Sequence, residues 1–243
     1  IIIFFTVRTI TERDDASLVS ALLSAFIPIT FSKTLFSLSP LTLALPLTFA
    51  AMLLFIKIPR KYATTAFIIT SVALAIVHPS AIIFIIALMG YLAISRVEGL
   101  ATEKSELELV FFSMFLFIWV QFLIFKKAFL AHGIAILQQN IPSEIVLGYF
   151  TDVSFGTALV QIGIIPLIGG IYSIYKYIFK VKNKYIYMYI SFALVAGLLV
   201  WIKFVEPFLG FMYLGVCLAV LTGPSYVLMA NYFRKTRFAK LWW

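Results

Sequence analysis

The chain has 243 residues, of which 63% are hydrophobic and only 12% are charged, and its mean hydropathy is +1.07. Soluble domains carry about 45–50% apolar and about 25% charged residues, so this composition excludes a soluble fold of this length. The net charge of +9 does not indicate a nucleic-acid partner, because the basic residues are not gathered on one face with stacking aromatics. They stand at the ends of apolar runs, as basic residues do in membrane proteins.

The apolar runs predict an all-α fold, a polytopic transmembrane helix bundle with about eight full spans plus a truncated first helix. Runs of this length without alternating polarity are expected to be helical, because backbone groups cannot stay unpaired in hydrocarbon. The chain opens without Met in the middle of such a run, so we expect residues 1–243 to be a single transmembrane domain cut from a longer chain. In chain order the runs are Ile1–Val7 (truncated), Leu18–Leu38, Leu41–Ile56, Ala63–Val77, Ala81–Ile94, Leu109–Phe125, Ala158–Phe179, Tyr185–Val205 and Phe208–Phe233.

The basic residues divide unevenly between the two sets of loops that alternating spans create. One set holds fifteen of the nineteen Lys and Arg residues, and the other holds only Lys33, Lys126, Lys127 and Lys203. By the positive-inside rule the first set faces the cytoplasm. This split predicts an integral, multi-pass membrane protein with a cytoplasmic C-terminus.

Two parts of this map have an ambiguous pattern. Ala63–Val77 and Ala81–Ile94 are short enough to form either two spans or a re-entrant hairpin. Residues 126–157 form the one long extracytoplasmic segment, which is too polar to span as one helix. Its moderately apolar stretches at Ile134–Leu137 and Ile145–Phe150 predict short helices that lie in the membrane interface.

Ionisable residues near a membrane tend to mark function, and those on the predicted outer side are the candidates for a substrate site. His78 and Pro79 interrupt two apolar runs at an outer turn, where the imidazole either meets interfacial water or hydrogen-bonds a phosphate or sugar hydroxyl. Lys126 and Lys127 either anchor a span at the interface or hold a lipid phosphate. The remaining candidates for substrate binding are His132, Glu144 and Asp152, and the two acids are either exposed loop charges or part of the same site.

Other chemistry finds little support in the residues. The acids on the cytoplasmic side, Glu106 among them, share short loops with basic residues and are expected to be solvated. Metal-ligand spacings and soluble-enzyme motifs are absent from the sequence, so we expect no metal and no cofactor. Cys217 lies in an apolar run and is expected to be a small buried residue. Gly169 and Gly170 are expected to permit close helix packing.

Residues from Arg8 to Ile94 resemble the middle of GT-C superfamily membrane glycosyltransferases, which include protein mannosyltransferases, oligosaccharyltransferase catalytic subunits and aminoarabinose transferase-like enzymes. The resemblance lies in the sequence of breakers: Arg8 and Arg13, Ala25-Phe26-Ile27-Pro28, Leu38-Ser39-Pro40, the basic turn Lys57–Lys61 and Val77-His78-Pro79. It implies a polyprenyl-phosphate-linked sugar as donor, with membrane lipids around it. It also implies a catalytic carboxylate in an extracytoplasmic loop that would precede Ile1, and substrate proximity for His78.

The resemblance therefore predicts transfer of a sugar from a polyprenyl-phosphate donor to an acceptor at the extracytoplasmic face. A multi-span transporter or flippase is the alternative, since helix breakers also suit substrate paths. A non-catalytic scaffold subunit is the third reading. The sequence does not identify the sugar, the acceptor or the oligomeric state.

Overall fold

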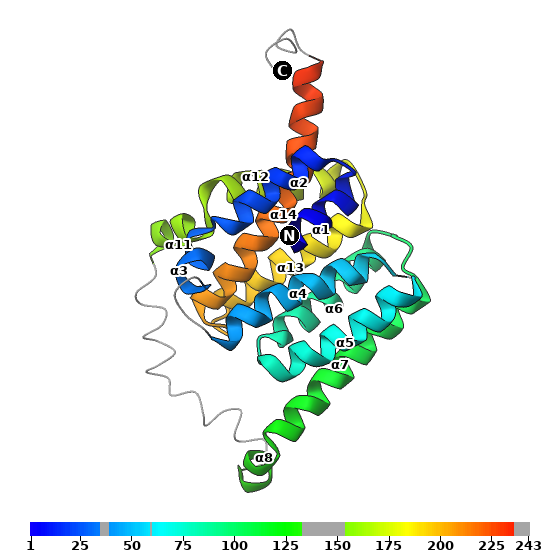
Figure 1. The fold of residues 1–243 in the computed structure, drawn as a ribbon, viewed down its shortest axis with the longest axis vertical. Helices are drawn as coiled ribbons and strands as arrows, with labels where there is room; N and C mark the ends of the chain where they lie inside the picture. The colour runs from blue at the N-terminus through cyan, green and yellow to red at the C-terminus, as the bar shows by residue number, and fades with distance from the viewer. Residues whose placement is uncertain (35–38, 59, 133–153, 236–243) are drawn as a thin grey trace.

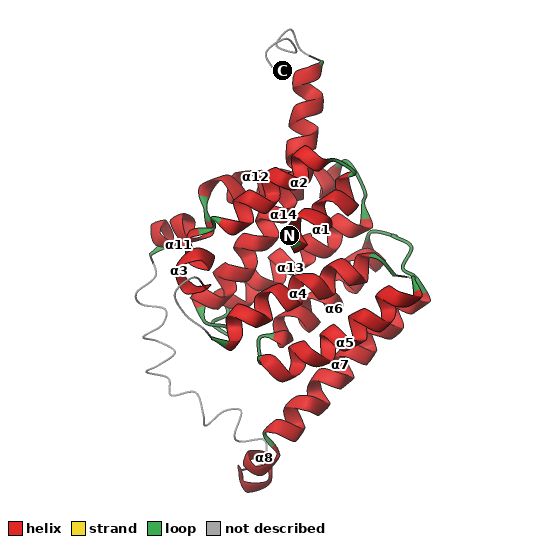
Figure 2. Ribbon diagram, in the orientation of Figure 1, coloured by secondary structure: helices red, strands yellow, loops and turns green. Residues whose placement is uncertain are grey.

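The computed structural model describes residues 1–34, 39–58, 60–132 and 154–235. Within these ranges all regular structure is helical and no strand occurs, which confirms the all-α prediction for this part of the chain (Figure 2). The helices are α1 (Ile2–Thr11), α2 (Asp14–Ala25), α3 (Pro28–Thr34), α4 (Pro40–Ile56), α5 (Lys61–Val77), α6 (Ala81–Val97), α7 (Lys104–Ile124), α8 (Lys126–His132), α11 (Phe155–Ile162), α12 (Ile164–Phe179), α13 (Lys184–Trp201) and α14 (Pro207–Arg234).

Helix α14 is the centre of the bundle. It packs against α12, α13, α2 and α1, and it also contacts α3 and α11 (Figure 1). A second group of helices extends from α13, where α6 lies beside α13, α4 beside α5, and α5 beside α7. Cys217, on α14, is fully buried, as expected from its apolar surroundings.

Small residues bring α12 close to α14. A methyl group added at Gly170 would lie 2.5 Å from Leu218 Cδ2, and one added at Gly169 would lie 2.7 Å from Thr222 Cγ2. Beside them the Ser225 hydroxyl donates to the Gly169 carbonyl at 2.5 Å. The expectation that this glycine pair permits close helix packing is confirmed.

Several helices are long and apolar enough to cross a membrane. Among the described residues three pass this test as single helices, α7, α13 and α14, and the number rises to five if each of two bent helix pairs is one span. Shorter apolar helices α1, α4, α5 and α6 accompany them. The predicted count of about eight full spans is therefore not confirmed. Helices α5 and α6 are compatible both with two spans and with a re-entrant hairpin.

Two runs predicted as single spans are broken. Leu18–Leu38 covers most of α2 and all of α3, which meet at 57°, and Ala158–Phe179 covers most of α11 and all of α12, which meet at 86°. Pro28, the first residue of α3, lacks the N–H that would continue the hydrogen bonding of α2. Gly163, between α11 and α12, has a φ of 93°, which side-chain-bearing residues rarely adopt. The sequence shows both breakers, but hydropathy continues across them.

Helix α7 presents a broad apolar face that the rest of the described chain does not cover. Phe111, Phe115, Ile118, Trp119 and Phe122 are each between 46% and 67% exposed. Exposed apolar surface of this extent is unusual on soluble monomers and marks contact with lipid or with a partner. This face agrees with the predicted lipid environment.

The two predicted sets of loops lie at opposite ends of the bundle. At one end Arg13 donates to Asn231 at 3.4 Å, and Lys182 forms an ion pair with Glu98 at 3.2 Å. At the other end the Lys33 ammonium lies 4.9 Å from the centre of the Phe208 ring. The Lys182–Glu98 pair joins two loops that the charge count assigned to the same side, and the other two contacts join a loop residue to the span end expected on its side.

Candidate functional site

The turn between α5 and α6 is the central element of the candidate site. His78 ends α5 in an extended conformation, and Pro79 and Ser80 lead into α6. The His78 Nδ1 accepts the backbone N–H of Ser80 at 3.0 Å. The imidazole therefore caps its own turn, which supports a structural role for His78. The bond uses only Nδ1, so Nε2 is left for a second partner.

The environment of His78 keeps its ring neutral. The side chain is half-buried, and the partial loss of water around it lowers the pKa of His78 from its ordinary value of 6.5. A neutral imidazole whose Nδ1 accepts a hydrogen bond carries its proton on Nε2. His78 is thus able to donate one hydrogen bond from Nε2 near neutral pH.

The turn is fixed to the centre of the bundle by two hydroxyl groups. Ser80 Oγ and Tyr213 Oη lie 2.9 Å apart and are buried, so the first half of α14 is tied to the start of α6. The Tyr213 ring packs against Phe49 and Phe192, with ring centroids 6.5 Å and 5.7 Å away. A turn attached in this way positions His78 on a rigid support.

The end of α7 reaches the same end of the bundle. Gln121 Nε2 donates to the Ala75 carbonyl at 3.0 Å, one turn before His78, and α8 begins two residues after α7 ends. Lys126 and Lys127 lie in the first turn of α8, and both are exposed. His132 is the last residue of α8. The structure therefore brings the two lysines to the end that carries His78, without a direct contact.

Two of the predicted site residues fall outside the described ranges. These are Glu144 and Asp152, together with the interfacial helices predicted at Ile134–Leu137 and Ile145–Phe150. The substrate-binding roles predicted for the six candidates remain predictions.

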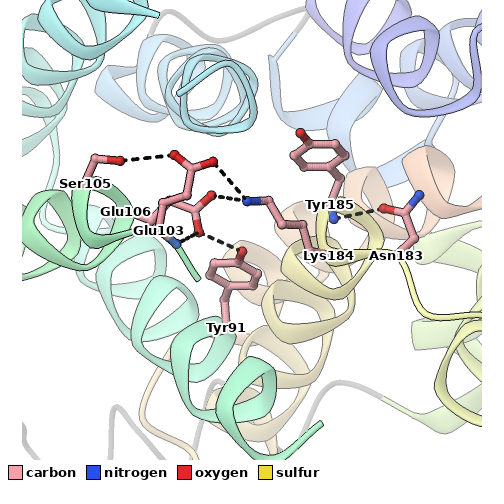
Figure 3. A network of polar contacts seen from close by, with 7 residues as sticks. All are labelled: Tyr91, Glu103, Ser105, Glu106, Asn183, Lys184 and Tyr185. Carbon is pink, nitrogen blue, oxygen red and sulfur yellow. Dashed lines mark hydrogen bonds and ion pairs between the residues drawn. The ribbon is translucent and has the colours of Figure 1, made fainter. Parts of the chain in front are cut away.

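A buried carboxylate at the opposite end was missed by the sequence analysis. The prediction that Glu106 is solvated is wrong, since its side chain is only 3% exposed. Glu106 Oε1 accepts from Lys184 Nζ at 2.7 Å, and Oε2 accepts from Tyr91 Oη at 3.3 Å (Figure 3). Glu103, the N-cap of α7, lies 3.9 Å from the same ammonium and forms a capping box with Glu106.

This network joins three helices that are far apart in the sequence. Tyr91 comes from α6, Glu106 from α7 and Lys184 from α13 (Figure 3). Nothing in the local sequence marks Glu106, because the spacing of the capping box is common and its lysine partner is 78 residues away. The network gives the buried Glu106 carboxylate an ion-pair partner and a hydrogen-bond donor, and it holds the ends of α6, α7 and α13 together.

No cluster of three His, Cys, Asp or Glu side chains suited to a metal ion occurs in the part of the chain that the structure describes. In the comparisons with known proteins, no family model, no curated protein and no solved structure matches the chain.

Proposed function

We propose that this chain is an integral membrane glycosyltransferase that moves a sugar from a polyprenyl-phosphate donor to an acceptor. The observation that supports this proposal is the state of His78: a neutral, half-buried imidazole that keeps Nε2–H as a donor at a turn fixed by Ser80 and Tyr213. A neutral donor of this kind suits a sugar hydroxyl or a phosphate oxygen. The resemblance of residues 8–94 to GT-C enzymes supplies the reaction class.

In the proposed reaction an acceptor nucleophile attacks the anomeric carbon, and the polyprenyl phosphate leaves with the bonding electrons. A carboxylate takes the proton of the acceptor as general base, and we assign it to no described residue. His78 is a positioning donor, because its Nδ1 already accepts the Ser80 N–H and its Nε2 carries the ring proton. Lys126 and Lys127 supply positive charge for the donor phosphate at the same end of the bundle.

We propose that this end faces outward and that the opposite end, with the C-terminus, faces the cytoplasm. The fifteen-to-four division of Lys and Arg supports this orientation. The exposed apolar face of α7 supports a lipid environment. We further propose that α5 and α6 both cross the membrane, since each lies along a helix that is long enough to do so, α7 and α13 respectively.

Three substitutions at position 78 separate a substrate contact from a turn cap. An asparagine amide oxygen can replace Nδ1 as the acceptor for Ser80, whereas a glutamine amide nitrogen can replace Nε2 as the outward donor. Transfer from a polyprenyl-phosphate sugar in proteoliposomes, normalised to folded protein, is the measurement. If His78 contacts the donor, His78→Ala and His78→Asn lose about 10- to 150-fold in rate and His78→Gln keeps most of it. Full activity in His78→Asn would leave this residue with a structural role only.

A transporter or flippase is the second candidate, favoured by the two broken helix pairs. Helices α3 and α11 contact each other, and a cavity of about 540 Å³ lies where both breaks meet, with Pro28 and Gly163 in its lining. Discontinuous helices that meet in this way build substrate paths in transporters. Proteoliposomes that move a fluorescent lipid-linked sugar between leaflets, without any acceptor, would favour this function over transfer.

A further inference from the structure

A second site lies at the opposite end of the bundle, between α12 and α14. It is a cavity of about 450 Å³ lined by Tyr172 and Lys176 of α12 and by Leu228, Met229, Tyr232 and Phe233 of α14. Helix α14 continues beyond the rest of the bundle from this point (Figure 1). The cavity therefore opens where the two helices separate.

The charge inside this cavity is not balanced by the described residues. Lys176 is half-buried, and its ammonium makes no hydrogen bond or ion pair with any described side chain. Three acids of the same loop set pair with other cations, namely Asp14 with Arg8, Asp15 with Arg13 and Glu98 with Lys182, and Glu12 forms no ion pair with Lys176. A lysine that has lost part of its water without gaining a carboxylate favours an anion brought from outside.

The lining supplies further hydrogen bonding. Tyr172 precedes Lys176 by one helical turn, so both side chains stand on the same face of α12. Tyr232 faces them from α14, one turn after Leu228. Two phenol groups and an ammonium suit the several oxygens of a phosphate, while Leu228 and Met229 suit the apolar part of the same ligand.

We propose that this cavity binds the phosphate headgroup of an anionic membrane lipid. The apolar surface next to it identifies a lipid as the occupant: Ile165, Ile168, Tyr172, Lys176 and Phe179 follow one another on one face of α12, and Ile165, Ile168 and Phe179 are 63–72% exposed. An acyl chain whose headgroup lies at Lys176 would run along Ile168 and Ile165. A soluble phosphate would make no use of this stripe.

The position of the cavity agrees with this occupant. It lies at the end of the bundle where Arg13, Lys180 and Lys182 are found, which belong to the loop set rich in basic residues. In the orientation proposed above this end faces the cytoplasmic leaflet, which holds the anionic lipids that attract such ends. The inference is independent of the glycosyltransferase proposal, since it concerns the other end of the bundle and none of its residues contacts His78.

Native mass spectrometry of the purified full chain, titrated with phosphatidylglycerol and with phosphatidylcholine, tests the site. We expect one phosphatidylglycerol to bind more tightly than phosphatidylcholine. Lys176→Gln should weaken the phosphatidylglycerol complex roughly tenfold, because a charge-assisted hydrogen bond is lost. Lys61→Gln is the matched control, since Lys61 is an exposed lysine at the same end, outside the cavity, and it should change binding less than twofold.

Two further variants protect the test against misfolding. Lys176→Arg keeps the charge and should retain selectivity for the anionic lipid, and Tyr232→Phe keeps the packing and should weaken binding several-fold. Equal losses in Lys176→Gln and Lys61→Gln would overturn the site in favour of diffuse attraction to the basic surface. Equal binding of the two lipids, or displacement of the bound lipid by inorganic phosphate, would overturn it as well.

Discussion

The Lys184 ammonium lies 2.7 Å from Glu106 Oε1, and this pair joins the start of α13 to the first turn of α7. Only 3% of the Glu106 side chain and 22% of the Lys184 side chain are exposed, so water screens the attraction weakly. The ion pair between Lys182 and Glu98, a few residues away, is far more exposed. Removing Lys184 should therefore cost much more stability than removing Lys182, although the two lysines are only two positions apart in the sequence.

We predict that Lys184→Met destabilises the protein by about 3–5 kcal/mol, because it leaves the Glu106 charge buried without its partner. Lys182→Met should lower the stability by about 1 kcal/mol or less, because the Lys182–Glu98 pair lies nearer the surface. Unfolding by denaturant in detergent micelles measures both. The double variant Lys184→Met/Glu106→Leu should recover much of the loss, and equal losses in the two single variants would contradict the assignment of Glu106 as a buried charge.

Close packing at Gly170 gives a second prediction. Gly170→Ala should destabilise the protein by about 1–3 kcal/mol, since the added methyl group would also lie 3.1 Å from the Leu218 backbone Cα and would push α12 away from α14. Gly197→Ala is the matched control, because no atom lies within 4 Å of a methyl group added there. This control should be neutral or stabilising, as alanine favours helix over glycine. Similar melting temperatures for the two variants would refute the close contact.

The lowered pKa of His78 predicts an acid-dependent loss of stability. The unfolded chain binds a proton to His78 near the ordinary value of 6.5, whereas the folded chain binds it only at lower pH. The contribution of His78 is therefore complete above pH 6.5 and falls as the pH drops from 6.5 toward the folded pKa. Melting temperatures of the parent chain and of His78→Gln should run parallel above pH 6.5 and converge below it. Parallel curves throughout would exclude this linkage.

Cysteine labelling in intact cells tests the proposed orientation. Cys217 is fully buried and should contribute little background. An impermeant maleimide should modify Pro79→Cys, in the exposed turn beside His78, and should modify Lys180→Cys only after permeabilisation. The reverse pattern would invert the map and place His78 in the cytoplasm.

The helical class and the two-ended arrangement of the chain could be predicted from the sequence, because composition and loop charge act over whole segments. Apolar runs require helices in hydrocarbon wherever they occur. The ion pair of Lys182 with Glu98 then joins two loops that the loop charges had already grouped. Neither inference needs knowledge of how one helix packs on another.

The helix breaks and the buried charge could not be predicted in this way. Pro28 and Gly163 are visible in the sequence, but many membrane helices accommodate proline and glycine without a sharp bend, and neighbouring helices decide the outcome. Glu106 is buried only because α13 brings Lys184 to it. At His78 the sequence predicted the turn, whereas the acceptor role of Nδ1 required the position of the Ser80 N–H.

The central position of α14 bears on how the protein is made. Helices α1, α2, α3, α11, α12 and α13 all pack against α14, yet all of them are synthesised before it. During translation the surfaces of these helices that will contact α14 stay exposed until α14 is made. The native bundle can therefore form only after this last described helix has entered the membrane. Premature termination anywhere in α14 would therefore leave an unassembled product for quality-control proteases, whatever the strength of the contacts formed before it.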